Sequence, residues 1–158
     1  MDTSELLSEG LKAGFGGGTS VGSPDRGSFI LQSSHYELDG NIYHDEWVNG
    51  GGQELIRTSD GQAMTRTYVG NVISEVRLEE LGITEKDVMK LLMKVIQEYA
   101  EHTRFDTDFE IQIEDWHYSY SVTYRKEDPF IINGIEEISY KNISVFVHTF
   151  GISKVIEE

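Results

Sequence analysis

The chain has 158 residues, of which 38% are hydrophobic and 11% aromatic, enough for one ordinary domain with a packed core. It contains no cysteine, which excludes a disulfide framework and a thiolate metal site. Its formal net charge of −15 disfavours direct binding to nucleic-acid backbones or anionic membranes, where affinity comes from cationic side chains.

The cellular location is predicted from the apolar segments. The acidic start of the chain, residues 1–5, lacks the basic residues and the apolar core of a signal peptide. No apolar run approaches the roughly 20 residues needed to span a bilayer. We therefore expect a cytoplasmic protein that binds no membrane. The sequence does not predict an oligomeric state.

The first half of the chain predicts one short helix and a series of strands. Residues 4–15 have the apolar spacing of an amphipathic helix, with Ser4 as its N-cap. Residues 16–28 are rich in glycine and serine and predict a loop. Alternating polarity and turn signals such as Asp39-Gly40 then predict strands over residues 34–38, 41–48, 53–58, 62–69 and 72–78.

The second half predicts a stronger helix, over residues 85–102. Thr84 is its expected N-cap, and Asp87 supplies a carboxylate three residues later. Apolar residues at helical spacing form one stripe along it, which is typical of a helix packed on a core. Strands are predicted beyond it, over residues 109–114, 117–124, 131–139, 143–150 and 152–156.

Short matches in the same order suggest an internal repeat. Gly52-Gln53-Glu54-Leu55-Ile56 resembles Gly134-Ile135-Glu136-Glu137-Ile138, and a second glycine follows in each half, Gly70 or Gly151. Upstream, Tyr43 can be set against Tyr118 if the second half has a longer loop at residues 125–128. Two unrelated meanders with coincidental Gly-x-Glu motifs would be the alternative.

These patterns predict an α+β fold in a single domain, residues 1–158. It consists of two pseudo-repeats, about residues 4–78 and 84–156, each a helix packed on an antiparallel β-meander. Half of the chain is a marginal core alone, so the two halves should pack together. A cleft between them is the expected place for a ligand.

The sequence also resembles a family of uncharacterised bacterial domains that occur alone or behind helix-turn-helix (XRE-type) regulator modules. The residues that carry the resemblance are Tyr43-His44-Asp45-Glu46-Trp47, Tyr68-Val69-Gly70 and the Gly-x-Glu motifs, over residues 5–156. The chain departs from that family at Thr149-Phe150-Gly151, where a glycine pair is expected. The resemblance implies a stand-alone sensory or ligand-binding domain and no known activity.

Metal and phosphate sites are not predicted. The five histidines are scattered, without the paired spacing of metal ligands. On a strand, His44 and Glu46 would share one face while Asp45 points to the other. The glycine clusters at residues 16–18 and 50–52 match no phosphate-binding motif. We expect no metal and no cofactor.

Candidate ligand-binding residues are acids and aromatics near the predicted cleft. Glu54 and Glu136 would face each other across the repeat axis, as a carboxylate pair for acid–base chemistry or as residues that tie down turns. Aromatic rings suit a pocket wall as well as cross-strand packing. The predicted set is Tyr43, Asp45, Trp47, Glu54, Tyr68, Trp116, Tyr118, Glu136 and His148.

Three functions follow from these patterns. The first is a small-ligand-binding domain, a sensor or a sequestering protein, rather than an enzyme. The second is an acidic protein-interaction protein or nucleic-acid mimic that inhibits a basic partner; solubility alone also explains the charge. The third is a hydrolase that uses Glu54 and Glu136. Partners would be a small molecule or a basic protein, with no direct nucleic-acid contact.

Overall fold

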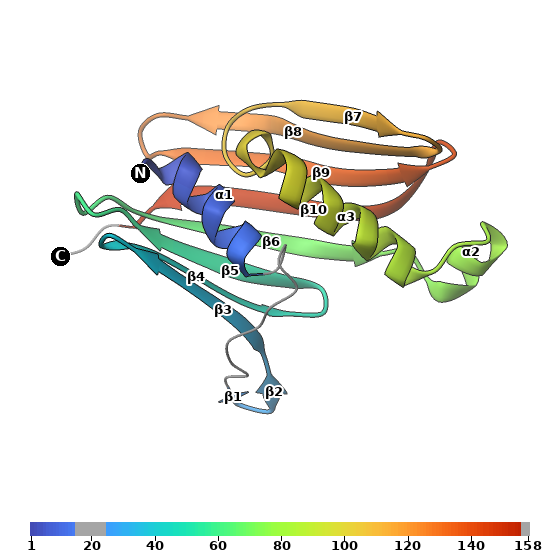
Figure 1. The fold of residues 1–158 in the computed structure, drawn as a ribbon, viewed down its shortest axis with the longest axis horizontal. Coiled ribbons are helices and arrows are strands. Elements are labelled where there is room, and N and C mark those ends of the chain that lie inside the picture. The colour runs from blue at the N-terminus through green and yellow to red at the C-terminus, as the bar shows by residue number, and fades with distance from the viewer. Residues whose placement is uncertain (15–24, 156–158) are drawn as a thin grey trace.

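The protein is an α+β fold built on one eight-stranded antiparallel sheet (Figure 1). The computed structural model describes residues 1–14 and 25–155. The strand order in the sheet is β3-β4-β5-β6-β10-β9-β8-β7. The strands are β3 (Gln32–Leu38), β4 (Asn41–Val48), β5 (Gly51–Arg57), β6 (Ala63–Val72), β7 (Phe109–Ile113), β8 (Trp116–Lys126), β9 (Ile131–Tyr140) and β10 (Ile143–Lys154).

Two four-stranded meanders make up this sheet. Strands β3 to β6 form one and β7 to β10 form the other, and they join through the antiparallel pair β6–β10. In that central pair, Tyr68 lies directly opposite Phe150. The last strand of each half of the chain, β6 or β10, therefore lies at the middle of the sheet, next to the other.

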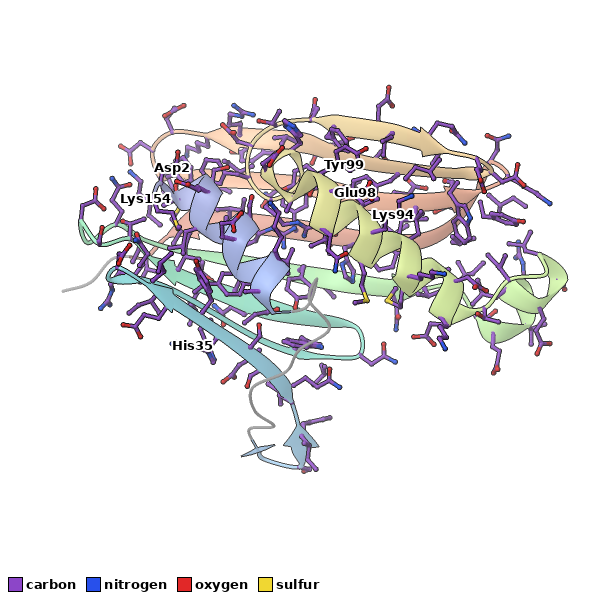
Figure 2. The ribbon with its side chains drawn as sticks, viewed as in Figure 1. Asp2, His35, Lys94, Glu98, Tyr99 and Lys154 are labelled. Carbon is purple, nitrogen blue, oxygen red and sulfur yellow. The ribbon has the colours of Figure 1, made fainter. Side chains whose placement is uncertain are left out.

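Helices cover one face of the sheet (Figure 1). The helices are α1 (Thr3–Ala13), α2 (Glu75–Glu80), α3 (Glu85–Tyr99) and the 3-10 turn η1 (Ala100–His102). Helix α1 contacts β3, β4 and β5 as well as α3. On the outer side of α3, Lys94 and Glu98 are exposed (Figure 2). A two-stranded ribbon, β1 (Asp25–Arg26) with β2 (Phe29–Ile30), precedes β3.

The predicted helices are present, with one changed cap. The Thr84 side chain accepts from the backbone N–H of Asp87, and the Asp87 carboxylate accepts from that of Thr84, so the predicted N-terminus of α3 is confirmed. The N-cap of the first helix lies two residues earlier than expected, because the capping side chain is the carboxylate of Asp2, which accepts from the Glu5 N–H, rather than the hydroxyl of Ser4.

Three sequence predictions about the strands differ from the structure. A strand over 72–78 is wrong, because β6 ends at Val72 and α2 follows with Ser74 as N-cap. The two strands predicted on either side of Gly151 are one continuous strand, β10. Of the predicted loop 16–28, residues 16–24 lie outside the described residues, and Asp25–Arg26 forms the short strand β1.

The core lies between the helices and the covered face of the sheet. Alternating residues of the central strands point to that face and are buried, for example Ile56, Met64, Phe150 and Ile152. Val88, Leu92, Val95 and Ile96 of α3 complete the core. None of the helices in the described part of the chain lies over the opposite face in Figure 1, and that face exposes residues such as Leu55 and Val69.

No helix among the described residues is long and apolar enough to cross a membrane.

Candidate functional site

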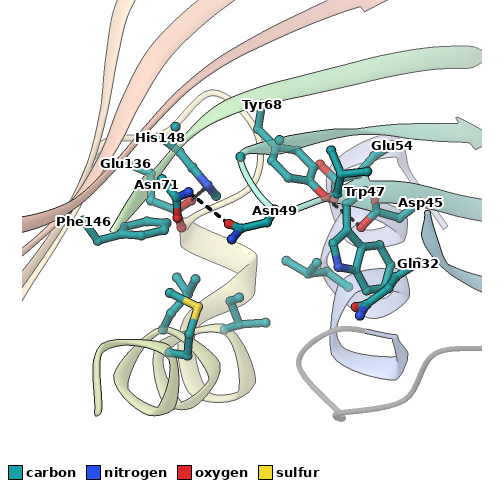
Figure 3. Close-up of a pocket in the computed structure, with 18 of the residues that line it drawn as sticks. Gln32, Asp45, Trp47, Asn49, Glu54, Tyr68, Asn71, Glu136, Phe146 and His148 are labelled. Atoms are coloured by element: carbon teal, nitrogen blue, oxygen red, sulfur yellow. Dashed lines mark hydrogen bonds and ion pairs between the residues drawn. The ribbon is translucent and has the colours of Figure 1, made fainter. Parts of the chain in front are cut away.

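A cavity of about 460 Å³ lies on the helix-covered side of the sheet. Its lining comes from both meanders and from both long helices. Figure 3 shows Asp45, Trp47 and Tyr68 on one side and Phe146 and His148 on the other. The lining residues used below are Trp47, Tyr68, Met89, Leu92, Ile96 and Phe146, which bring apolar surface, and Asp45, Glu54, Arg66, Glu85, Arg104, Glu136 and His148, which bring ionisable groups.

The period of the strands explains why charged groups gather on this face. Asp45 pairs with Glu54 across β4 and β5, and Glu54 pairs with Arg66 across β5 and β6, so the three side chains stand in one row. Cross-strand neighbours on one face lie about 5 Å apart. Each of the three side chains is 1 or 2% exposed. Burial of three ionisable groups is unusual, so each needs a partner.

Glu54 is held by two partners. Its Oε2 accepts from Arg66 Nη1 at 2.6 Å and its Oε1 accepts from the Tyr43 hydroxyl at 2.8 Å. Burial on its own would lower the pKa of Arg66, but the charges of Glu54 and Glu136 and the hydrogen bond to Glu54 act together with smaller effects to hold that pKa well above its usual value. The guanidinium also packs against the rings of Phe150 and Tyr68, at 5.0 and 5.8 Å from their centroids.

Glu136, in the other meander, has a similar set of partners. It accepts from the Tyr118 hydroxyl at 2.7 Å and forms an ion pair with Arg104. His148 Nδ1 lies 3.6 Å from its second oxygen. Burial on its own would raise the pKa of Glu136, but the charge of Arg104, the neighbouring His148 and the charge of Arg66 together hold it well below its usual value. Glu136 is therefore a carboxylate at neutral pH.

Asp45 differs from both glutamates. Among the described residues, the hydroxyl of Tyr68 donates to it, 3.1 Å from each oxygen, and no cationic side chain forms an ion pair with it. Burial and the nearby charge of Glu54 raise the pKa of Asp45 to about 8, against the smaller opposing effects of Tyr68, Arg66 and Arg104. Within the described residues, Asp45 is thus the one buried acid of the cavity lining that forms no ion pair.

Two arginines of the site were not among the residues predicted from the sequence. Arg66 and Arg104 are each nearly fully buried, and Arg66 Nε and Nη2 and Arg104 Nε have no hydrogen-bond partner among the described residues. A single arginine in a strand, or one after a helix, reads as a surface residue. The available signal was that Arg66 stands twelve residues after Glu54, across a short hairpin.

The structure brings six of the nine predicted ligand-binding residues to the cavity. Asp45, Trp47, Glu54, Tyr68, Glu136 and His148 line it. Tyr43 and Tyr118 do not; they are fully buried and donate to the two glutamates. Trp116 lies elsewhere, with its ring 4.6 Å from that of Tyr140. Whether these residues bind a ligand stays a prediction.

The described residues offer no site with three or more metal-ligating side chains. As expected from alternation, His44 and Glu46 share the open face of the sheet, 3.2 Å apart, while Asp45 points into the cavity.

No family model, curated protein or solved structure matches this chain. The resemblance to uncharacterised bacterial domains therefore stays a prediction.

Proposed function

We propose that the chain is a small-ligand-binding domain, a sensor or a sequestering protein, whose site is the cavity on the helix-covered face of the sheet. The observation that carries the proposal is a concave, mainly apolar space in which a few polar groups converge and at least one has a strongly perturbed pKa. A volume of about 460 Å³ suits a molecule of drug-like size or smaller. A cytoplasmic location is part of the same proposal.

The proposal includes an origin of the two meanders by duplication. In its support, Glu54 on β5 lies opposite Arg66 on β6, and in the same way Glu136 on β9 lies opposite His148 on β10. Tyr43 and Tyr118 also occupy matching register positions, opposite Ile56 and Ile138 respectively. The loop after β8 is the longer one, as the sequence alignment of the halves requires.

A pair of glycines adds to this. A Cβ on Gly52 would lie 2.5 Å from the Tyr68 hydroxyl, and one on Gly134 would lie 2.3 Å from the Phe150 ring. Each glycine thus makes room for an aromatic side chain of the next strand. If the two halves are superposed by these strand registers, Gly70 corresponds to Ile152 rather than to Gly151. The match between the two second glycines in the sequence alignment is therefore off by one residue.

A hydrolase that uses Glu54 and Glu136 is less well supported. Each carboxylate is already bound by an arginine and a tyrosine, and such ionised, fully partnered groups are typical of structural ion pairs. Acid–base catalysis by two carboxylates needs environments that separate their pKa values and leave one able to exchange a proton with substrate. The interaction-protein alternative stays a prediction.

The two tryptophans of the chain allow a direct test. The Trp116→Phe variant keeps only Trp47, which lines the cavity, and Trp47→Phe keeps only Trp116, which packs on Tyr140. We would screen metabolites by thermal shift, where a ligand at 100 times its Kd adds about 2.7 kcal/mol. Each hit should then change the emission of the Trp47-only variant and leave the Trp116-only variant unchanged.

Hits that change both variants equally, or only the Trp116-only variant, would place binding outside the cavity. No thermal shift from any member of a broad panel would contradict the proposed function.

A further inference from the structure

We propose that the ligand of this cavity is an organic cation, a protonated amine with an apolar body, and that its ammonium group pairs with Asp45. The inference rests on the proposed function and names the chemical class of its ligand.

The charges on the cavity wall favour a cation. The two buried arginines are already neutralised, Arg66 by Glu54 and Arg104 by Glu136. Asp45 is left over, 1% exposed and with only a neutral hydroxyl as partner among the described residues. A buried carboxyl group without a cation is costly in its ionised form. A ligand ammonium would supply the missing charge.

Two aromatic rings lie near this carboxyl group. Trp47 is two residues along the same strand and on the same face, and the Tyr68 hydroxyl donates to Asp45. Figure 3 shows both rings next to Asp45. An ammonium is attracted to the faces of tryptophan and tyrosine rings, more strongly where water is excluded. Carboxylate and rings together therefore match an alkylammonium group.

The rest of the cavity suits the apolar body of such a ligand. Met89, Leu92 and Ile96 of α3 also line it, and so does Phe146 of β10. An anionic ligand has less support, because each described basic side chain of the lining, Arg66, Arg104 or His148, already lies beside a carboxylate. The chain's net charge of −15 would also repel anions.

Three probes of matched shape separate the alternatives: 2-phenylethylamine, 2-phenylethanol and 3-phenylpropionate. We expect the amine to raise the melting temperature of the wild-type protein and the alcohol and carboxylate to have much smaller effects. In Asp45→Asn, affinity for the amine should fall about 10- to 100-fold, the size expected for a charge-assisted hydrogen bond. Asp115→Asn is the control, because it makes the same substitution at an exposed turn residue outside the cavity lining.

Calorimetry of the wild-type protein gives a second readout that needs no variant. Asp45 is surrounded by Glu54 of β5, Arg66 and Tyr68 of β6, and Arg104 after η1. With its raised pKa it holds a proton near pH 7, and pairing with an ammonium would release that proton to the buffer. The measured binding enthalpy of 2-phenylethylamine should therefore change with the ionisation enthalpy of the buffer.

Amine binding that is equally tight in Asp45→Asn, or that releases no proton near pH 7, would overturn the inference. So would tighter binding of the carboxylate or the alcohol, while the proposed binding function would stand. Failure of all three probes to bind the wild-type protein also counts against the inference. The separate metabolite screen then decides whether the proposed function fails with it.

Discussion

The carboxylate of Glu54 and the guanidinium of Arg66 form an ion pair 2.6 Å long, and both side chains are at most 2% exposed. Opposite charges in such a place have given up their hydration, so their attraction must offset two large desolvation penalties. The Tyr43 hydroxyl and the Phe150 and Tyr68 rings provide further contacts. The pair therefore fixes the positions of two residues of the cavity lining more than it adds net stability.

Removing one partner of this pair should be strongly destabilising. Glu54→Gln leaves the Arg66 charge buried without a counter-ion, and we expect a loss of about 3–5 kcal/mol in the free energy of unfolding, measured by urea denaturation. The control is Glu80→Gln, which breaks an Arg77–Glu80 pair whose side chains are more than 60% exposed. That loss should stay below about 1 kcal/mol.

The double variant Glu54→Gln/Arg66→Met removes both charges and should recover part of the stability lost in the single variant. Equal losses in Glu54→Gln and Glu80→Gln would show that the buried pair has no special role.

Asp45 should make the protein less stable as the pH rises. Its pKa is raised to about 8 in the folded protein, mainly by burial, from about 3.9 in an unfolded chain. The folded state therefore keeps a proton that the unfolded state releases between these values. The stability from this group is present below pH ~4 and is lost as the pH rises to about 8.

The measurement is guanidinium chloride unfolding of wild type and Asp45→Asn at several pH values between about 5 and 8. Relative to the variant, wild type should lose up to about 1.4 kcal/mol per pH unit. Tyr68→Phe removes a hydrogen bond that lowers the pKa of Asp45, so in that variant the loss should continue to higher pH. Parallel curves for wild type and Asp45→Asn would contradict a protonated Asp45.

Local signals in the sequence predicted much of the fold. The capping box at Thr84 and Asp87 and the turn at Asp39-Gly40, where both residues have positive φ, depend on neighbouring residues only. The strand predicted over 72–78 failed because Val76 and Leu78 alternate with polar residues, as a strand would, although only Leu78 is buried, in the short helix α2. Gly151 failed as a strand end because its neighbours in β6 and β9 hold it in the sheet.

The candidate site was harder to predict for a physical reason. Which side chains meet in it depends on the register of six strands and on the pairing of β6 with β10, and no local signal determines either. Alternation correctly placed Asp45 on the face opposite to that of His44 and Glu46. It could not show that Tyr43 is fully buried and donates its hydroxyl to Glu54, instead of lining the cavity.

Glu136 should have the opposite effect on pH dependence from Asp45. Its folded-state pKa lies well below the usual value, because Arg104, His148 and Arg66 together outweigh the effect of burial. The stability it contributes is present above an unfolded pKa of about 4.3 and is lost as the pH falls below that value. Glu136→Gln should therefore be destabilised at neutral pH, yet lose less further stability than wild type on acidification.

Acid titration followed by circular dichroism, with urea unfolding at neutral pH, checks both parts of this expectation. Glu137→Gln is a matched control, because the neighbouring residue on β9 points to the open face. We expect it to change the free energy of unfolding by no more than about 0.5 kcal/mol. An acid transition of Glu136→Gln as steep as that of wild type would contradict the ion pair with Arg104.

Gly10 gives a test in which helix propensity and packing predict opposite results. Replacing a glycine inside a helix by alanine stabilises it by about 1 kcal/mol on propensity alone. A Cβ at Gly10, however, would lie 2.1 Å from Cγ of Tyr43, which is completely buried and whose hydroxyl donates to Glu54. Tyr43 cannot move without giving up that bond, and overpacking typically costs about 1–3 kcal/mol.

We therefore expect Gly10→Ala to lower the free energy of unfolding despite its better helix propensity, as measured by urea denaturation. Glu98→Ala, on the exposed side of α3, is the control and should change stability by no more than about 0.5 kcal/mol. The clash would displace Tyr43, whose hydroxyl donates to Glu54 of the cavity lining, so Gly10→Ala should also weaken ligand binding in the cavity. A more stable Gly10→Ala protein would mean that α1 can move away from β4, and that the cavity wall on this side is adjustable.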